Sequence, residues 1–550
     1  MSTSTAPHDE TDPKSRPLNP LVNPLLTDLY AITMAYAHWR NGRHRETATY
    51  ELFFRRNPFG GEYTVFAGLE ECVKLLHAFR FTDEQIEFLK TQVHLQHADP
   101  AFWPWLRSVD CSSVKVTAVR EGTIVFPRIP LLLVEGPLAV CQLLETPLLN
   151  AINFPSLVAT NATRFRQAAG ADKMLIEFGL RRAQGPDGGV SASRYAYMGG
   201  FDYSSNVLAG QLCGVPLNGT MAHAFVQSFQ GRADLQSATL LSPPPEEAEA
   251  PLADNVFALR AELGWLNTHE GELCAFIAYA QAFPSSFLCL VDTYDAIKSG
   301  VRNFLLVALA LLRIGYRPIG IRIDSGDISY LSKVARAEFG DFSVRMGVNF
   351  RRLMIVASND INEPTLLSLR QQGHEVDAFG VGTHLVTCQA QPALGCVYKL
   401  VLVNEKPRIK LSQEVEKMTI PGCKRAFRLH NSAGAPVVDL LQHMEEPPPL
   451  PGQRILCRHP FQESKRAYVT PSRVEPLHTV VWDGAFTAAY RPPFLDLAAL
   501  RAFVMEQVAR LREDHMRPIN PTPYKVSVTN ELYTRLHAAW LEESPIPEIN

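Results

Sequence analysis

The sequence has no long hydrophobic run. No window holds about 18 uninterrupted apolar residues, so no membrane-spanning helix is expected. Its first 20 residues are polar and proline-bearing, and they lack the apolar middle of a signal peptide. We therefore expect residues 1–20 to be disordered and the protein to be cytoplasmic, in the cytosol, without a membrane partner.

An excess of charge of either sign is also absent, because 53 basic and 56 acidic side chains leave a formal net charge of -3. Such a balance gives no indication of a nucleic-acid partner or of an anionic membrane surface. The ten cysteines are scattered singly, with no C-x-x-C pair. In a chain of 550 residues this pattern is typical of reduced core cysteines rather than of a disulfide framework or a zinc site.

What the sequence does contain is an ordinary globular composition, with 46% hydrophobic and 20% charged residues. The N-terminal part predicts a helix that starts at Thr27 or Asp28, because apolar residues recur there at helical spacing. A strand, a glycine-containing turn and a helix are expected over residues 50–76, and β structure over 113–135. Two helices are expected next, over 136–153 and 156–170.

The pattern changes at about residue 173, where short apolar runs alternate with amphipathic helical stretches. Such alternation predicts parallel strands covered by helices, either as a barrel or as a doubly wound sheet. The six runs are 174–178, 215–219, 287–292, 318–324, 353–358 and 376–382.

Other signals mark the rest of the chain. Residues 232–254, with three consecutive prolines and nearby acids, predict a flexible surface insertion. After residue 395 we expect a β-hairpin that turns near Asn404 and Glu405, and later one more helix at about 494–513.

Polar and reactive side chains follow each of the six runs. Because the carboxyl ends of parallel strands meet at one edge, we expect these side chains to gather there. Arginine grips carboxylate or phosphate, glycine-rich helix starts favour phosphate, and aspartates hold magnesium together with substrate phosphates. The set therefore suits an anionic, phosphorylated and metal-bound ligand: Arg181, Arg182, Thr220, His223, Asp292, Thr293, Arg322, Asp324, Asp327, Asn359, Asp360, Gly380, Gly382 and Thr383.

Each of these signals has a structural alternative when taken alone. The GVGT stretch at 380–383 is common in turns, and the DSGD stretch at 324–327 can be a helix N-cap, a function, or both. A lone histidine such as His223 is more often structural, one arginine of a pair usually forms a salt bridge, and Tyr30 is by default a core residue. Only their joint placement favours a functional site.

At these residues the chain resembles the nicotinate phosphoribosyltransferases. The resemblance runs from about residue 24 to 430 and becomes loose beyond it. The matching stretches include PLLTDLY, ELFFRRNPFGG, LLETPLL, SLVATNA, GLRRAQGPDGG, GGFDYSSNVLAG, GVPLNGTMAHAFVQSF, LVDTYD, IRIDSGD, GVGT, GCVYKL and PGCKRAFRL.

The resemblance implies an α/β fold in which an irregular α/β barrel, residues 161–394, packs on an α/β sandwich formed by residues 21–160 and 395–550. It implies a homodimer with a shared active site and an ATP-coupled enzyme of the ligase class. The expected reaction converts nicotinate, phosphoribosyl pyrophosphate (PRPP), ATP and water to nicotinate mononucleotide, pyrophosphate, ADP and phosphate, the first step of NAD salvage from nicotinate. Magnesium or manganese is the implied metal, and ATP is a co-substrate.

The resemblance also implies residue roles. His223 would accept phosphate from ATP, with Asp292 and Asp324 beside it in the catalytic centre. Nicotinate would be held by Tyr30, which stacks on its ring across the dimer, and by Phe178, Arg181, Thr220 and Arg322. The PRPP phosphates would be bound by Asn359, Gly382, Thr383 and Lys424. The metal would be bound by Asp324 and Asp327. One departure is Ala224, where a serine often follows the histidine, so that a hydroxyl is missing beside the phosphorylation site.

Several alternatives stay open at this point. A nicotinamide phosphoribosyltransferase would hold its neutral amide with an aspartate where this chain has Asn206, and an aspartate would repel a substrate carboxylate. A quinolinate-using enzyme would be shorter and more basic at its site. A non-catalytic regulatory protein on the same scaffold would have lost site residues. An aldolase would need a Schiff-base lysine at a strand end, and none of the six runs ends in lysine.

Overall fold

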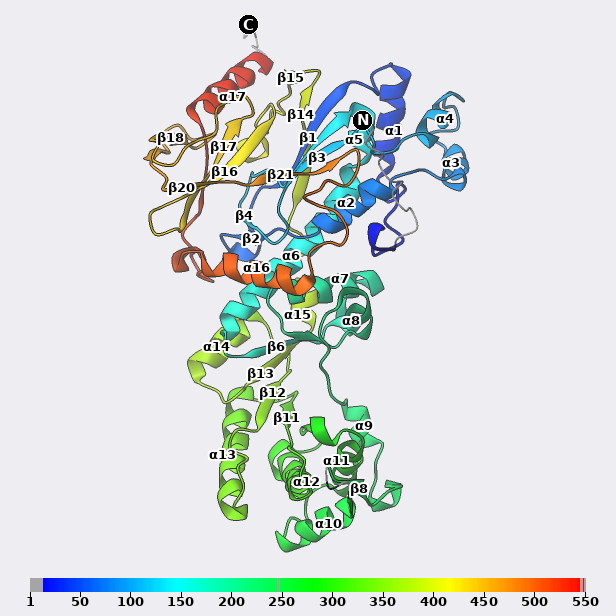
Figure 1. Ribbon diagram of the computed structural model, residues 1–550, viewed down its shortest axis with the longest axis vertical. Coiled ribbons are helices and arrows are strands. Elements are labelled where there is room, and N and C mark those ends of the chain that lie inside the picture. The colour runs from blue at the N-terminus through cyan, green and yellow to red at the C-terminus, as the bar shows by residue number, and fades with distance from the viewer. Residues whose placement is uncertain (1–12, 245, 247, 545–547, 549–550) are drawn as a thin grey trace, which may run out of the picture. The chain divides into compact units, whose positions relative to one another are not determined.

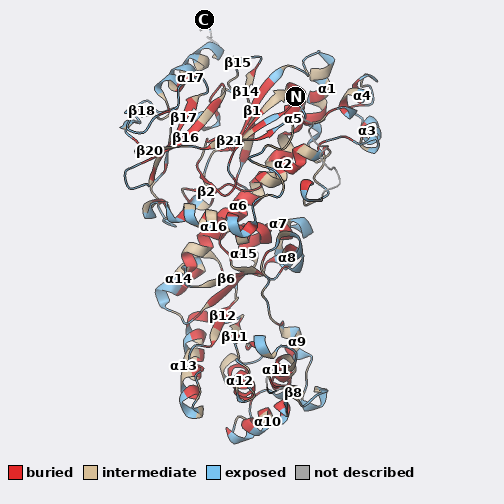
Figure 2. Cartoon of the chain, in the orientation of Figure 1, coloured by how far each residue is buried: buried red, intermediate tan, exposed pale blue. Residues whose placement is uncertain are grey.

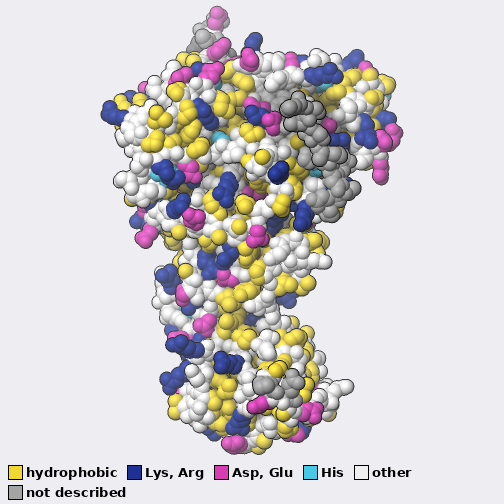
Figure 3. Space-filling view, in the orientation of Figure 1, with side chains coloured by type: hydrophobic (Ala, Val, Ile, Leu, Met, Phe, Trp, Pro, Cys, Tyr) yellow, Lys and Arg dark blue, Asp and Glu magenta, His cyan; other side chains and the backbone are white. Residues whose placement is uncertain are grey.

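The computed structural model describes residues 13–244, 246, 248–544 and 548, which divide into two units (Figure 1). The first unit combines the chain up to Asn161 with the chain from Ala390 onward, and the second spans Ala162–Gln389. No helix in the described part of the chain is both long and apolar enough to cross a bilayer. On the face shown in Figure 3, basic and acidic side chains of the described residues are interspersed.

The first unit contains an antiparallel sheet of six strands. Its order is β15 (Lys406–Pro407), β14 (Cys396–Val403), β1 (Thr47–Phe54), β5 (Leu132–Pro137), β3 (Lys115–Val119) and β21 (His478–Asp483). The expected hairpin between β14 and β15 is confirmed, since Asn404 and Glu405 take the positive φ angles, 47° and 62°, that such a tight turn requires. Helix α1 (Leu29–Arg40) begins after Asp28, as predicted, and packs against α5 (Leu138–Leu143).

A second sheet of six strands completes this unit. Its order is β19 (Arg466–Val469), β18 (Ile455–Arg458), β22 (Lys525–Val528), β17 (Pro436–His443), β16 (Lys424–His430) and β20 (Arg473–Pro476). Phe427, Leu429, Leu440 and Ile455 pack into a buried apolar cluster on it. Helix α17 (Asn530–Glu543), which the sequence did not lead us to expect, packs on β17 and β18. The expected helix at 494–513 is present as α16 (Leu497–Ala509).

The first unit also contains short elements. Among them are α2 (Leu69–Ala78), α3 (Asp83–Lys90), α4 (Phe102–Arg107) and the small pair β2 (Thr64–Val65) and β4 (Ile124–Val125).

The second unit is built on one parallel sheet of six strands. Its order is β10 (Leu288–Leu290), β11 (Gly320–Ile323), β12 (Met354–Ala357), β13 (Ala378–Val381), β6 (Met174–Glu177) and β7 (Tyr203–Ser204). These strands are buried along most of their length, as Figure 2 shows for β6 and β12. Within the described residues no ladder joins β7 to β10, so the sheet forms an incomplete barrel of the predicted α/β class.

Helices connect and cover these strands. They are α7 (Gly185–Met198), α8 (Val207–Cys213), α9 (His223–Gln227), α10 (Leu252–Glu262), α11 (Glu270–Ala282), α12 (Arg302–Arg313), α13 (Ile328–Met346), α14 (Glu363–Gln372) and α15 (Thr383–Val386). A π-helical turn, Ala296–Val301, leads into α12.

The structure corrects three expectations along the chain. Residues 13–20 are ordered, with a 3-10 turn at Pro13–Ser15 and a bond from Leu18 N to Glu71, while the rest of the predicted disorder, 1–12, lies outside the described residues. The run 215–219 is not a strand, because Leu217 makes only one bridge, to Ser204 of β7. The two helices expected over 136–170 are instead the short α5 and the long α6 (Glu145–Ala169), which continues through Pro155.

The insertion at 232–254 contains secondary structure in its described residues. β8 (Leu240–Leu241) pairs with β9 (Glu249–Ala250) in an antiparallel hairpin. Tyr316 donates its hydroxyl to the Leu241 carbonyl, 3.0 Å away, and Gln281 donates to two carbonyls that precede β8. The insertion is therefore bonded to the rest of its unit.

Candidate active site

The strand ends of the second unit carry most of the predicted site residues. Phe178 follows β6, Asp292 and Thr293 follow β10, and Asp324 follows β11. Asn359 comes shortly after β12, and Gly382 directly after β13. Since β10 to β13 and β6 are consecutive parallel neighbours in the sheet, all of these residues lie at one edge.

His223 is the first residue of α9 and lies between two polar side chains. Its Nδ1 is 3.1 Å from Thr293 Oγ1, and its Nε2 is 3.5 Å from Asp324 Oδ2. The imidazole is oriented at both nitrogens, yet 38% of the side chain is exposed, which leaves it open to a bulky ligand. This arrangement suits a histidine that acts as a nucleophile rather than one that only supports the core.

Asp292 and Asp324 are linked to each other through the backbone. Asp292 Oδ2 accepts from the Asp324 amide at 2.9 Å and from the Ser325 hydroxyl. Asp324 Oδ1 accepts from Ser358 Oγ at 2.6 Å, while Asp292 Oδ1 is buried without a hydrogen-bond partner among the described residues. Two adjacent carboxylates, one with a free oxygen, suit magnesium, which takes one or two carboxylates and completes its shell with substrate phosphates and water.

No group of three or more histidine, cysteine or acidic side chains that could hold a metal occurs in the part of the chain that the structure describes. A metal here would therefore depend on substrate oxygens. Asp327, the other expected metal residue, caps α13 by accepting from the Tyr330 amide at 2.9 Å. The structural alternative for the DSGD stretch is thus confirmed at Asp327.

Arg322 points from β11 toward the residues expected to hold nicotinate. Its Nη2 donates to the Met221 carbonyl at 3.0 Å, and its guanidinium carbon lies 5.8 Å from the centre of the Phe178 ring. Burial lowers the pKa of Arg322, although its group stays charged at neutral pH.

Two donors at or near Arg322 have no partner among the described residues. They are Arg322 Nε and Thr220 Oγ1, and both atoms are buried. Because an unpaired buried donor costs about 1–3 kcal/mol, such atoms indicate a missing acceptor. A carboxylate is the acceptor that a guanidinium binds best.

Glycine makes room for the aromatic side chain of this site. A Cβ at Gly380 would overlap Cδ2 and Cε2 of the Phe178 ring, so only glycine allows the ring its position. Gly382 and Thr383 form the start of α15. Asn359 contacts the Gly326 carbonyl at 3.5 Å, and the exposed Arg181 is close enough for its charge to contribute to the lowered pKa of Arg322.

Tyr30 and Lys424 belong to the first unit. Tyr30 is 44% exposed on α1. Lys424 is 1% exposed; its ammonium lies 2.8 Å from Glu51 Oε1 and donates to the carbonyls of Ile420 and Gly422 at 2.5 and 2.7 Å. The phosphate contact of Lys424 stays a prediction, but in this structure its ammonium is already engaged by the Glu51 carboxylate and by two carbonyls that precede β16.

A buried network beside the site was not expected from the sequence. Glu177 Oε2 accepts from Ser193 Oγ at 2.7 Å and from Ser204 Oγ at 2.5 Å. Asn206 donates to Ser193 Oγ at 3.1 Å and accepts from the Ala209 amide, so both ends of its amide are engaged. The only available signal was an acidic residue inside the apolar run 174–178.

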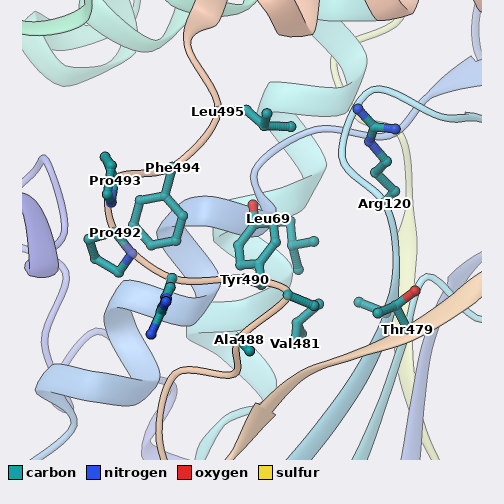
Figure 4. A pocket seen from close by; sticks show the side chains of 13 residues that line it. Leu69, Arg120, Thr479, Val481, Ala488, Tyr490, Pro492, Pro493, Phe494 and Leu495 are labelled. Atoms are coloured by element: carbon teal, nitrogen blue, oxygen red, sulfur yellow. The ribbon is translucent and has the colours of Figure 1, made fainter.

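A separate cavity of about 400 Å³ lies within the first unit (Figure 4). Leu69, Val481, Tyr490 and Phe494 line it, with the exposed Arg120 at its edge. None of the predicted site residues lines this cavity, so we assign it no part in the site.

The fold and the strand-end residues together define a class: an α/β-barrel protein whose site presents a histidine, two carboxylates and a partly buried arginine, a set that suits an anionic ligand. Family models described as the nicotinate phosphoribosyltransferase N-terminal and C-terminal domains match residues 25–153 and 423–536. The second match extends the likeness well into the C-terminal region, which the sequence had indicated only loosely.

Relatives cover nearly the whole chain. "Nicotinate phosphoribosyltransferase 2" of Arabidopsis thaliana is 52% identical over 97% of this chain and 97% of its own length. The nicotinate phosphoribosyltransferase of Homo sapiens is 46% identical over 98% of this chain and 99% of its own. A crystal structure of human nicotinic acid phosphoribosyltransferase matches with a TM-score of 0.84 and 45% identity, covering 93% of this chain and 99% of that one. The chain belongs to the nicotinate phosphoribosyltransferase family.

Proposed function

We propose that the protein joins nicotinate to the phosphoribosyl group of PRPP and couples this step to ATP hydrolysis. The products are nicotinate mononucleotide, pyrophosphate, ADP and phosphate. The observation that carries the proposal is the placement of His223 between Thr293 and Asp324 in a chain that is 46–52% identical to named nicotinate phosphoribosyltransferases.

The phosphoryl step uses His223. A ring nitrogen forms a bond to the terminal phosphorus of ATP while the bond from that phosphorus to the ADP oxygen breaks. Thr293 and Asp324 hold the imidazole in one orientation, which lowers the entropic cost of reaching the in-line geometry. Hydrolysis of the phosphohistidine releases phosphate and restores the ring.

The glycosyl step uses the residues around Arg322. The nicotinate carboxylate would accept from Arg322 Nε and Thr220 Oγ1, the two buried donors that have no partner. Phe178 would cover one face of the pyridine ring, and Tyr30 of a second subunit would cover the other. The ring nitrogen then forms a bond to the anomeric carbon of the ribose as the bond to pyrophosphate breaks.

Magnesium or manganese would be held by Asp292 and Asp324 together with PRPP oxygens and would supply charge neutralisation for the departing pyrophosphate. Gly382, Thr383 and Asn359 would bind the PRPP phosphate, with Arg181 near the ligand. The homodimer is supported by the exposure of Tyr30, and a cytosolic location by ten free thiols.

Nicotinamide is the second candidate substrate. The neutral Asn206 favours nicotinate, because an aspartate at this position would repel a carboxylate at close range. An assay with nicotinate or nicotinamide, PRPP and magnesium, with and without ATP, distinguishes the two substrates through the mononucleotide that is formed.

The same assay tests His223. We expect His223→Ala to lose both the ATP stimulation and the ADP production, whereas a matched change of the exposed His94 to alanine should leave both intact. Preferred turnover of nicotinamide, or no turnover of either substrate by the folded protein, would overturn the proposal.

A further inference from the structure

Glu272 is a carboxylic acid in the core of the second unit. It lies on α11 and is 0% exposed. Its Oε2 accepts from Ser299 Oγ at 2.6 Å and from Asn303 Nδ2 at 2.9 Å, while its Oε1 is buried without a partner among the described residues. No cation pairs with Glu272 in that part of the chain, so the acid is not part of a core salt bridge.

The two partners of Glu272 connect it to the loop that follows β10. Ser299 lies in the π-helical turn Ala296–Val301, and Asn303 lies one turn further, in α12. The turn is capped by Asp295, whose carboxylate accepts from the Ile297 and Lys298 amides. A π-helical turn at such a place is often associated with a functional site.

The same turn contacts the residue that follows β10. A Cβ at Gly300 would overlap the carbonyl oxygen of Val291, so the turn and the strand end are in direct backbone contact. Val291 immediately precedes Asp292 and Thr293. Any shift of the turn is therefore transmitted to both residues.

A second route runs through His269, which caps α11. Its backbone amide donates to Ser299 Oγ at 2.9 Å, and its carbonyl accepts from Asn303 at 3.0 Å. Its ring stacks on Tyr294 with 3.7 Å between centroids and 14° between planes. Tyr294 thus stacks on the ring of a residue whose backbone is bonded to both partners of Glu272.

We propose that Glu272 is a positioning residue for the reaction: through Ser299 and Asn303 it holds the loop 292–295 and thereby places Thr293 against His223. Glu272 touches neither the substrate nor the histidine. This inference rests on the proposed function. It adds to that function a residue of another helix, α11, that controls the orientation of the phosphorylated histidine.

The protonation state of Glu272 gives the proposal a distinct signature. Burial raises the pKa of Glu272 to about 7, opposed by the hydrogen bonds from Ser299 and Asn303 and increased by the charges of Asp292 and Asp295. His269 and Cys289 are the other titratable groups close to it. Ionisation above neutral pH therefore adds a buried negative charge that the charges of Asp292 and Asp295 oppose, and we expect activity to fall as Glu272 ionises.

Steady-state turnover of three full-length variants tests the proposal. Glu272→Ala removes both acceptors, and we expect kcat to fall about 10- to 100-fold, as for a misplaced catalytic group, with little change in the KM for nicotinate. Glu272→Gln keeps an acceptor and is always neutral, so it should retain activity and lose the decline above about pH 7 that we expect of the wild type. Ser299→Ala should reproduce part of the Glu272→Ala effect, and the two changes should be non-additive.

The controls separate a local effect from general destabilisation. Ser343→Ala removes another buried hydroxyl of the same unit, bonded to Phe339 and Phe350, and should leave kcat and its pH profile unchanged. Folded Glu272→Ala with wild-type kcat, or Glu272→Gln with an unchanged alkaline decline, would overturn the proposal. If Glu272→Ala does not fold, the pH profile of Glu272→Gln decides.

Hydrogen exchange provides a readout independent of activity. Peptides covering 289–301 should exchange faster in Glu272→Ala than in the wild type and Glu272→Gln. If the wild type turned over no nicotinate, the proposed function would fail, and exchange would still decide whether Glu272 holds this loop. If Glu272→Ala and the wild type exchange at the same rate, the proposal that Glu272 holds this loop is overturned as well.

Discussion

The buried pair of Lys424 and Glu51 allows a sharp test of whether Lys424 is structural or binds phosphate. Both side chains are almost inaccessible, at 1% and 4% exposed, and Lys424 Nζ lies 2.8 Å from Glu51 Oε1. Burial raises the pKa of Glu51, and the nearby ammonium only partly opposes this effect.

Lys424→Met leaves the carboxyl group of Glu51 buried without its cation. Breaking a buried pair in this way costs about 3–5 kcal/mol, because the remaining charge must be neutralised or solvated. The double variant Lys424→Met/Glu51→Leu removes both charges and fills the space with apolar atoms. Its free energy of unfolding should return to within about 1 kcal/mol of the wild type or exceed it.

Urea denaturation of the two variants, followed by turnover at saturating nicotinate, checks both expectations. A structural lysine predicts a destabilised single variant and a stable, active double variant with an unchanged KM for PRPP. The reasoning is refuted if the single variant is as stable as the wild type. A stable double variant whose KM for PRPP rises more than about tenfold, a loss of about 1.4 kcal/mol of binding, would instead restore the phosphate contact that the family resemblance implied.

Three further predictions follow from buried groups in the second unit. Asn206→Asp loses the donors to Ser193 Oγ and the Gly189 carbonyl and adds a charge near Glu177, so urea denaturation should show a loss of about 1–3 kcal/mol or more; unchanged stability would contradict this network. Gly380→Ala should displace the Phe178 ring and raise the KM for nicotinate about tenfold in steady-state assays, whereas an unchanged KM would remove Phe178 from the site. Because the pKa of Glu272 is raised from 4.5 to about 7, the native state binds more protons than the unfolded state in this range. The stability of the wild type relative to Glu272→Gln should therefore fall by up to about 3 kcal/mol as the pH rises from 4.5 to 7, and denaturation curves parallel across this range would refute the assignment.

Local patterns were sufficient for most of the fold. Five of the six apolar runs became strands of the parallel sheet, and the hairpin at Asn404 and helix α1 lie where turn and cap signals placed them. These features depend on neighbouring residues, so the sequence reveals them directly. The run 215–219 did not become a strand: it contains Pro216 and ends at Gly219, two residues that weaken strands, and its pairing reduces to one bridge.

Pro155 shows why a helix prediction from neighbouring residues alone can be wrong. A proline usually ends or kinks a helix, yet α6 continues through Pro155 where two separate helices were expected. Just after Pro155, Ser156 and Thr160 accept from the Ala67 and Val65 amides and so tie the helix to a segment about 90 residues away. Tertiary bonds of this kind have no counterpart in the local sequence.

The candidate site divides in the same way. The sequence was sufficient to indicate which residue types follow each strand and, because parallel strands share an edge, that Asp292, Arg322 and Asp324 gather in one place. His223 follows the run 215–219, which is not a strand, so this argument did not place it. The individual partners became known from packing: Thr293 for His223, Ser358 for Asp324, and Glu51 for a lysine expected to bind phosphate. The physical reason is the distance along the chain over which each feature is determined. The order of helices and strands follows from residues that are close in sequence. The partner of a buried polar atom is a side chain that can be far away in sequence and that packing brings within about 3 Å.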